Sequence, residues 1–275
     1  MAASAFASSA MNVLIRLAAE TLHSFEIAFF RNLFGILAML PGVLGHGLRQ
    51  TLRTAHFPLH ALRGVLNAGA MLTFFYALPI TPLATVAALG FTAPLFATLL
   101  AVLVLHERVG PRRWVGIACG FGGVLIVLRP GMEGVPPAAW LLVASALLWA
   151  GALVVIKLLA RSDSSLTITF YASCFLTPIT LAFALFDWRW PDPWMLAVLV
   201  AIGLLGTATQ FLLAQAFHEA DASRVLPIDF TKLIWASFFG FWLFDEVPDL
   251  ATIVGGSVIL TAVSYVALRE ERVRP

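Results

Sequence analysis

The chain has 275 residues, of which 60% are hydrophobic and 12% are charged. Ordinary soluble domains carry about 25% charged residues, so this composition indicates a membrane protein and excludes an ordinary soluble globular domain. The formal net charge of +2 becomes informative through its distribution along the chain.

Apolar runs of membrane-spanning length follow one another along the sequence. A spanning helix needs about 20 mostly apolar residues, because the hydrocarbon core of a bilayer is about 30 Å thick. Ten such runs are separated by short polar connections: 2–19, 25–45, 59–79, 82–105, 112–129, 137–160, 166–186, 193–217, 222–244 and 249–268. The sequence therefore predicts an all-α, polytopic integral membrane protein with ten transmembrane helices.

The basic residues predict the orientation of these helices. With the N-terminus in the cytoplasm, twelve of the 17 Lys and Arg residues fall on the cytoplasmic side, three on the opposite side and two inside spans. By the positive-inside rule both termini are then cytoplasmic, in a bacterial-type inner (plasma) membrane. Because topology accounts for the basic residues, we expect the lipid bilayer and no nucleic acid as a partner.

The second half of the chain repeats the first. The sequences around Phe91 and Phe230 match at a shift of 139, and each is followed sixteen positions later by a glutamate, Glu107 or Glu246. VLIR, from residue 13, matches VVIK, from residue 154, at a shift of 141. The near-constant shift indicates two copies of one unit, a first five-helix repeat at 1–131 and a second at 136–275.

Five spans in each repeat is an odd number, so the two copies must cross the membrane in opposite directions. Inverted repeats of this kind are a common construction of secondary transporters. Their substrate binds near the membrane midplane between the halves, and alternating access exposes it to each side in turn. The sequence thus predicts a transporter with a central cavity between the repeats.

At this point the sequence resembles the drug/metabolite transporter (DMT) superfamily, and within it the ten-helix EamA-type members. The similarity is carried by YALPITPLATVAALGFTAPLFATLLAVLVLHERVGPRRWVGIACGFGGVLIVLRPG at 76–131 and by AFFRNLFGILAMLP at 28–41, in which Arg31 stands at the family's characteristic arginine. A departure is Ser8-Ser9-Ala10 in the first span, where family members show Trp followed by small residues. The apolar, aromatic-rich helices are most similar to YddG-type amino-acid exporters.

The resemblance implies export of small amphipathic metabolites, amino acids (including aromatic ones) first among them. The alternative is another cargo, such as a vitamin, a nucleoside-like metabolite or a drug, and uptake in place of export. The chain has no G-x-S-x-G or H-E-x-x-H motif, so we expect no enzymatic activity, metal or cofactor. The oligomeric state is left open between a monomer and a homodimer.

Asp229 and Lys232 are two opposite charges near the middle of the span at 222–244. An isolated charge at a helix centre costs about 2.5–3.5 kcal/mol, so both must be neutralised. Three residues apart on a helix, they can pair with each other. Alternatively they face the cavity, where Lys232 meets a substrate carboxylate and Asp229 meets an ammonium group or a proton. Their counterparts in the first repeat, Gly90 and Ala93, are uncharged, which favours the second interpretation.

Two prolines and one arginine are candidate gating or hinge residues. Pro227 and Pro94 interrupt corresponding spans, because proline removes a backbone donor. A tolerated packing kink is the alternative. Arg31 is either neutralised by Glu26 or by a carbonyl at a helix end, or it takes part in gating.

Further candidates for a substrate-binding cavity are polar or aromatic side chains within spans, where unsatisfied polar groups are costly. Each of the polar ones could instead form a bond between helices. The set consists of Asn12, Tyr76, Phe91, Trp149, Tyr171, Gln210 and Phe230. Glu107 and Glu246 are interpreted as charges that suit the N-termini of the helices they precede.

Overall fold

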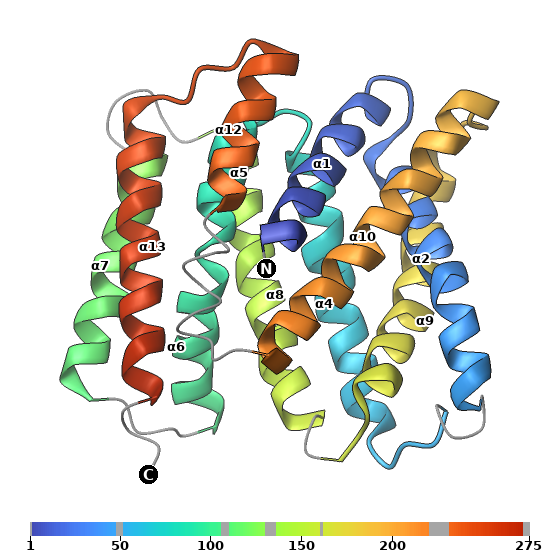
Figure 1. Ribbon diagram of the computed structural model, residues 1–275, viewed down its shortest axis with the longest axis horizontal. Helices are drawn as coiled ribbons and strands as arrows, with labels where there is room; N and C mark the ends of the chain where they lie inside the picture. The colour runs from blue at the N-terminus through green and yellow to red at the C-terminus, as the bar shows by residue number, and fades with distance from the viewer. Residues whose placement is uncertain are drawn as a thin grey trace.

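The computed structural model describes residues 2–47, 52–105, 110–129, 136–159, 162–219 and 231–271. Within these ranges the protein is built from helices standing side by side, with the chain passing repeatedly from one end of the bundle to the other (Figure 1). The predicted fold class is confirmed: the chain is an all-α polytopic membrane protein. Five segments are long and apolar enough to span a membrane by length and composition: Ser24–Gly45, Leu83–Val104, Pro137–Leu159, Leu166–Asp187 and Pro193–Gln210.

The helices follow the predicted spans closely. They are α1 (Ala2–Ala18), α2 (Ser24–His46), α4 (Phe57–Ala77), α5 (Leu83–Gly90), α6 (Ala93–Leu105), α7 (Pro111–Leu128), α8 (Pro137–Leu159), α9 (Ser165–Ala184) with the short 3-10 turn η1 (Leu185–Asp187), α10 (Pro193–Glu219), α12 (Thr231–Phe244) and α13 (Leu250–Glu271). We call the end at which α2, α5 and α13 begin the Glu246 end, and the end at which α4, α7 and α9 begin the Asp163 end. The Glu246 end is at the top of Figure 1.

The span expected at 82–105 is two helices. The nitrogen of Pro94 carries no hydrogen, so it cannot donate to the carbonyl of Gly90, where α5 ends. The turn is closed by hydrogen bonds that reach back three residues instead of four. The backbone N–H of Phe91 donates to the Ala88 carbonyl at 3.3 Å, and that of Thr92 to the Leu89 carbonyl at 3.0 Å. The Thr92 hydroxyl also donates to Leu89, at 2.7 Å. The interruption expected at Pro94 is therefore present, and its role as a hinge stays a prediction.

Helices α7 and α13 form an antiparallel pair at one side of the bundle (Figure 1). A Cβ atom at Gly123 would lie 2.8 Å from the carbonyl oxygen of Gly255, and one at Gly255 would lie 2.7 Å from that of Gly123. Only glycine fits such an approach of two backbones, and small residues of this kind let membrane helices pack closely.

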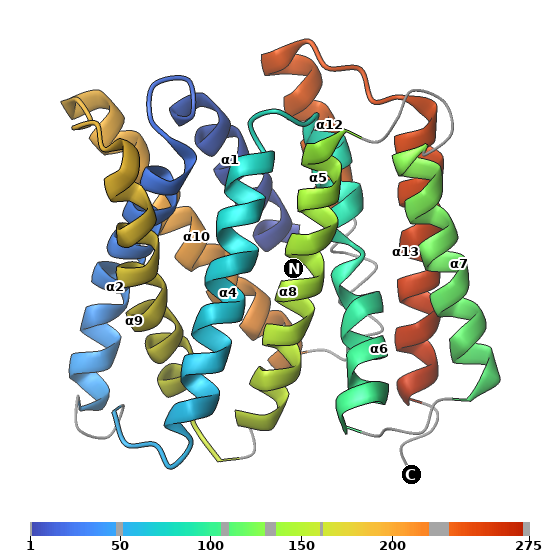
Figure 2. The same cartoon turned by 180° about the vertical axis from the view of Figure 1, so that it is seen from behind.

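In the rest of the bundle, the helices of one predicted repeat pack mainly on those of the other. Helix α4 lies between α8 and α9 (Figure 2), and α1 packs against α10 and α12. Fully buried core residues come from both halves, such as Ile15, Leu89, Ile202 and Ile259. The interface between the halves is therefore the core of the protein, and any relative motion of the halves must rearrange it.

Candidate functional site

Three helices have an end near the middle of the bundle's height. Helices α1 and α12 begin at mid-height, and the break between α5 and α6 lies at a similar height (Figure 1). Helix α12 packs against both α1 and α5. The first turn of α6 offers few free donors, because Pro94 has no N–H and the N–H groups of Leu95 and Phe96 donate to the Thr92 carbonyl at 3.0 and 3.1 Å. What the start of α6 offers an anionic group is therefore partial positive charge.

Polar side chains line the contact of α1 with α10 and α12. The Ser4 hydroxyl donates to the Thr209 carbonyl of α10 at 3.0 Å, and the Ser9 hydroxyl donates to the Lys232 carbonyl of α12 at 3.3 Å. On a helical wheel Asn12 falls between Ser4 and Ser9, so it lies on the face of α1 directed at the seam between α10 and α12.

Two polar atoms in this region have no hydrogen-bond partner. Asn12 Oδ1 and Thr209 Oγ1 are both buried and unpaired. A buried polar group without a partner is costly, and such groups in a native fold require an explanation. A bound polar molecule that supplies donors to these atoms is one explanation that fits their place in the bundle.

Lys232 is the second residue of α12 and is half-buried. It takes part in interactions within the protein. Its position adds a positive charge to the N-terminus of α12. Asp229, Phe230 and Pro227 lie outside the described residues, so the expected Asp229–Lys232 pair and the hinge at Pro227 stay predictions.

The bundle is tied together at the Glu246 end. The Glu246 carboxylate accepts a hydrogen bond from Arg16 of α1 through Oε1, and through Oε2 it accepts the backbone N–H of Leu83 at 2.9 Å. The Arg16 guanidinium also lies 4.3 Å from the ring centre of Phe244. Glu246 was expected to serve the helix that it precedes, but its carboxylate instead caps α5. We call Arg16, Glu246 and Leu83 the Glu246 latch.

A second polar cluster lies at the Asp163 end. Asp163 Oδ2 lies 2.7 Å from His60 Nε2 and accepts the Thr54 hydroxyl at 2.7 Å. The Tyr171 ring stacks on His60 with 4.5 Å between ring centres. Burial alone would raise the pKa of the Asp163 carboxyl, but the hydrogen bonds from Thr54 and His60 outweigh it, so the pKa is lowered from 3.8. Beside this cluster, Arg63 donates to the Ile168 carbonyl.

Arg31 is neutralised by neither of the expected groups. Its Nη1 donates to the side chain of the adjacent Asn32 at 2.9 Å. Arg31 and Glu26 both lie in the described part of the chain, and no hydrogen bond joins them. Asn32 in turn donates to Thr180 of α9 at 3.4 Å. A Cβ atom added to Gly206 of α10 would lie 2.9 Å from Arg31 Nε, so the arginine occupies the space left by that glycine. Its gating role stays a prediction.

The other predicted cavity residues are spread along the bundle. Phe91 is buried at the break between α5 and α6, and Trp149 is half-buried near the middle of α8. Tyr76 lies at the Glu246 end of α4 with 48% of its surface exposed. Tyr171 lies at the Asp163 end, where its hydroxyl donates to the Leu52 carbonyl at 2.8 Å. Gln210 is exposed on α10.

The structure thus brings Lys232 and Phe91 toward mid-height, places Asn12 about 15 Å along α1 toward the Glu246 end, and leaves Tyr76 and Tyr171 at opposite ends. Sequence reasoning missed Thr209, Ser4 and Ser9. Isolated Ser and Thr are frequent in membrane helices and usually bond to their own backbone, so the sequence carried no signal for them beyond their place in a span.

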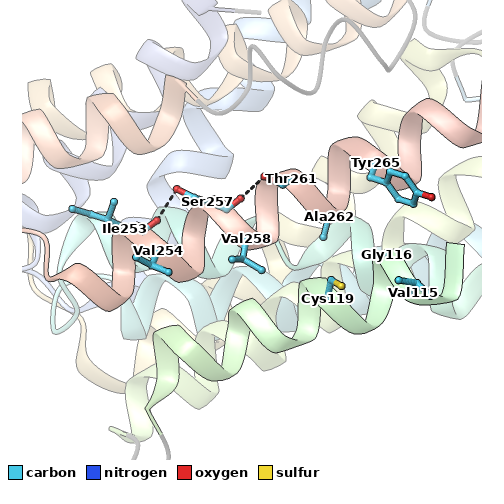
Figure 3. Close-up of a pocket in the computed structure, with 10 residues that line it drawn as sticks. All are labelled: Val115, Gly116, Cys119, Ile253, Val254, Ser257, Val258, Thr261, Ala262 and Tyr265. Atoms are coloured by element: carbon cyan, nitrogen blue, oxygen red, sulfur yellow. Dashed lines mark hydrogen bonds between the residues drawn. The ribbon is translucent and has the colours of Figure 1, made fainter. Parts of the chain in front are cut away.

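A groove lies elsewhere, on the surface of the α7–α13 pair (Figure 3). It has a volume of about 610 Å³ and is lined mainly by apolar side chains. Its hydroxyl groups are used locally: Ser257 donates to the Ile253 carbonyl at 2.7 Å and Thr261 to the Ser257 carbonyl at 2.8 Å. With its polar groups satisfied in this way, the groove is suited to contact with lipid. In the described part of the chain no cluster of metal-ligating side chains is found.

Comparison with known proteins adds a family and several carriers. The model of the EamA-like transporter family matches residues 1–129 and again residues 136–268. The chain is 32% identical over 265 residues to the S-adenosylmethionine uptake transporter of Rickettsia felis, covering 96% of this chain and 90% of that protein. It is 34% identical over 255 residues to the riboflavin transporter of Vibrio cholerae serotype O1, covering 91% and 85%.

A pseudopaline exporter of Pseudomonas aeruginosa is 30% identical over 262 residues, covering 94% of this chain and 90% of that protein. One solved crystal structure covers 99% of this chain with a TM-score of 0.65 and 18% identity, which is a similarity of fold alone. None of these carriers is named as an amino-acid exporter. The comparisons therefore do not support the expected resemblance to YddG-type exporters in particular.

Proposed function

Because the chain belongs to the EamA-like transporter family and is a metabolite transporter, we propose that it is a secondary carrier of a nucleoside-like or vitamin-like metabolite. Such a cargo joins a planar heteroaromatic ring to a polar chain. This was the alternative raised by the sequence. It is supported by full-length similarity to carriers named for S-adenosylmethionine and riboflavin, and amino-acid export becomes the competing outcome.

The observation that carries the proposal is that two polar atoms beside the contact of α1 with α10 and α12, Asn12 Oδ1 and Thr209 Oγ1, are buried without a partner. They suit a cargo with hydroxyl or amino groups, such as a ribose, a ribityl chain or an adenine. Lys232 adds a place for a carboxylate or a similar anionic group. Phe91 and Trp149 are candidates for contact with a planar ring.

Alternating access between the two repeats is the proposed mechanism. In this state the Glu246 latch holds α1 and α5 of the first repeat to the α12–α13 connection of the second. Opening of the Glu246 end requires that this latch separates. The distribution of basic residues favours a cytoplasmic Asp163 end in the inner (plasma) membrane, and in a gradient-driven carrier the direction of net transport follows the gradients of cargo and coupled ions.

A binding screen with the purified protein tests the cargo class. Thermal unfolding in detergent would be measured with S-adenosylmethionine, riboflavin and phenylalanine. We expect stabilisation by one of the first two, since a ligand that binds the folded state raises its stability. Stabilisation by phenylalanine alone would favour an amino acid as the cargo, and stabilisation by none of the three would contradict the proposal.

Two nearly isosteric variants locate the site. Asn12→Leu and Thr209→Val remove the unpaired atoms while keeping similar volume, so we expect folding to be preserved. Each lost hydrogen bond to the cargo should weaken binding by about 1–1.5 kcal/mol, or about tenfold. The matched control is Ser257→Ala, which removes a hydroxyl on the lipid-facing groove and should leave the dissociation constant unchanged.

A further inference from the structure

We propose that Glu26 is a proton-binding site, and that uptake of a proton by its carboxylate accompanies closure of the Glu246 end. The coupling to transport rests on the proposed function. The binding of the proton does not, and it can be tested without any cargo.

Glu26 is the third residue of α2 and is fully buried, with 0% of its surface exposed. Its Oε2 accepts one long hydrogen bond, from the backbone N–H of Arg189 at 3.3 Å. Its Oε1 is buried and has no partner. A carboxylate ion in such a place has lost water and gained too few donors in return, whereas a neutral carboxyl group is much cheaper to bury.

The cation whose charge acts on Glu26 is Arg189, and the neighbouring charge of Asp187 opposes it. The guanidinium of Arg189 is paired with Asp187, with 3.7 Å between Nε and Oδ1, and both side chains are more than half exposed. His23, at the start of α2, uses Nδ1 to accept the backbone N–H of Phe25. Arg31, further along the same helix, donates to Asn32.

The elements packed against α2 offer no further counter-charge. Helix α9 contains no charged residue. In α1 the one charged residue is bound to Glu246, and Glu20 beyond it is exposed. The charged residues and histidines of α4 and α10 lie toward the Asp163 end, and the one titratable residue of α4 at the Glu246 end is the phenol of Tyr76, whose ring centre lies 6.3 Å from that of Phe25 and which carries no positive charge. The charged residues and histidines are Arg16 of α1, His60 and Arg63 of α4, and His218 and Glu219 of α10.

Buried aromatic rings follow Glu26 along α2. Phe29 and Phe30, one turn along α2, are both buried, and the Trp188 ring centre lies 5.8 and 5.6 Å from theirs. Trp188 is adjacent to Arg189, whose backbone binds Glu26. The rings thus form an apolar cluster beside the segment that binds Glu26, which is itself fully buried.

The internal repeat shows that the scaffold does not need an acid at this position. Residues 26–31, EIAFFR, correspond to residues 167–172, TITFYA, at the shift of 141. The counterpart of Glu26 is Thr167, whose backbone N–H donates to the Ser164 hydroxyl oxygen at 3.1 Å. The first turn of α9 is thus capped by neutral groups. Glu26 is an addition to the first copy, as a coupling residue would be.

Glu26 belongs to the first repeat and Arg189 to the second, so Glu26 lies where the halves meet at the Glu246 end. When the halves separate there, water reaches the carboxylate and it can ionise. Closure buries it again and requires that it first binds a proton. The proton is therefore carried between states by the movement of the two halves.

Infrared difference spectroscopy of the purified full-length protein tests proton binding directly. Near neutral pH we expect a C=O stretching band of a protonated carboxyl group that Glu26→Gln abolishes and Glu26→Asp retains. The band should persist in Asp163→Asn, because Asp163 is ionised and well hydrogen-bonded. A band that Glu26→Gln leaves unchanged, or no such band in the wild-type protein, would overturn the proposal. The Glu26→Asp variant guards against a folding defect in Glu26→Gln.

Proteoliposomes loaded with labelled S-adenosylmethionine test the coupling. We expect Glu26→Gln to lower the ratio of proton-gradient-driven flux to cargo exchange by about tenfold, since the site that binds the proton is gone. A Glu26→Gln protein that responds to the gradient as the wild type does would overturn the coupling. If the wild type showed no flux of S-adenosylmethionine, that cargo would be wrong. The infrared result on proton binding by Glu26 would still hold, because that experiment needs no cargo.

Discussion

The polar clusters at the two ends of the bundle differ in how much of their side chains is exposed to solvent. At the Asp163 end, the side chains of His60 and Asp163 are 0% and 6% exposed, and Asp163 also accepts a hydroxyl group. At the Glu246 end, the side chains of Arg16 and Glu246 are 20% and 16% exposed. Both clusters join one repeat to the other. The drier cluster should act as a fixed joint, and the wetter one should be able to separate.

Removing the buried acid at the Asp163 end should have the largest effect. Asp163→Ala leaves His60 and Thr54 without their shared acceptor, and breaking a buried pair typically costs about 3 kcal/mol or more. Thermal unfolding in detergent measures the loss. Asp187→Ala, which breaks an exposed pair with Arg189, is the control and should change stability by less than about 1 kcal/mol. Equal effects of the two variants would mean that the Asp163 end is no fixed joint.

The close contact between α7 and α13, away from both ends, should give a stability change of intermediate size when it is disturbed. Gly123→Ala places a Cβ atom 2.8 Å from the Gly255 carbonyl and must push α7 and α13 apart, whereas Gly122→Ala meets nothing within 4 Å. We expect Gly123→Ala to cost about 1–3 kcal/mol and Gly122→Ala to be nearly neutral, by the same unfolding measurement. A reversed order would contradict the close packing of this pair.

Loosening the Glu246 latch should change accessibility more than stability. A loss of about 1 kcal/mol at this partly exposed pair in Glu246→Gln corresponds to about a fivefold rise in the open population. The probe is a cysteine at buried Ser9, labelled by a water-soluble thiol reagent after Cys119 and Cys174 are replaced by serine. Arg129→Gln, which breaks the exposed pair with Asp249, should leave labelling unchanged. Equal labelling of the latch variant and its parent would show that Arg16 and Glu246 do not control opening.

The smallest expected effect is on the pH dependence of stability. The pKa of Asp163 is lowered in the folded protein, so its stabilisation is complete above its unfolded-state pKa of about 3.9 and is lost as the pH falls through the folded-state value. The stability difference between wild type and Asp163→Asn should therefore shrink below about pH 4. A difference that grows with falling pH would give the wrong sign and contradict the hydrogen-bonding account.

Much of the fold could be predicted because a bilayer imposes a strong constraint. Run length located the described helix ends to within a few residues, while the start expected at 222 lies outside the described residues, and Pro94 located the break between α5 and α6. The shift between the repeats predicted which helices correspond. The sequence did not show that α1 would pack on α10 or that Glu246 would cap α5, since both contacts join positions more than 150 residues apart.

The candidate site was harder to predict than the fold. Asn12 was identified because an amide is rare in an apolar span. Thr209 was missed, because a hydroxyl in a membrane helix usually bonds to its own backbone. The aromatic and polar candidates were chosen by type, which does not distinguish a residue at mid-height from one at an end of a helix. The predicted spans already put Tyr76 near the end of one helix and Tyr171 near the start of another, whereas their ring contacts with Phe25 and His60 could not be read from the sequence.

The central claim is that one site between the halves is exposed alternately to the two sides of the membrane. Counterflow in proteoliposomes tests it most directly, with labelled S-adenosylmethionine inside and unlabelled S-adenosylmethionine added outside. The account predicts that external cargo accelerates release of the label with saturation, and that the double variant Asn12→Leu, Thr209→Val loses this acceleration while remaining folded. Release that is independent of external cargo, or a double variant that exchanges as well as the wild type, would contradict it.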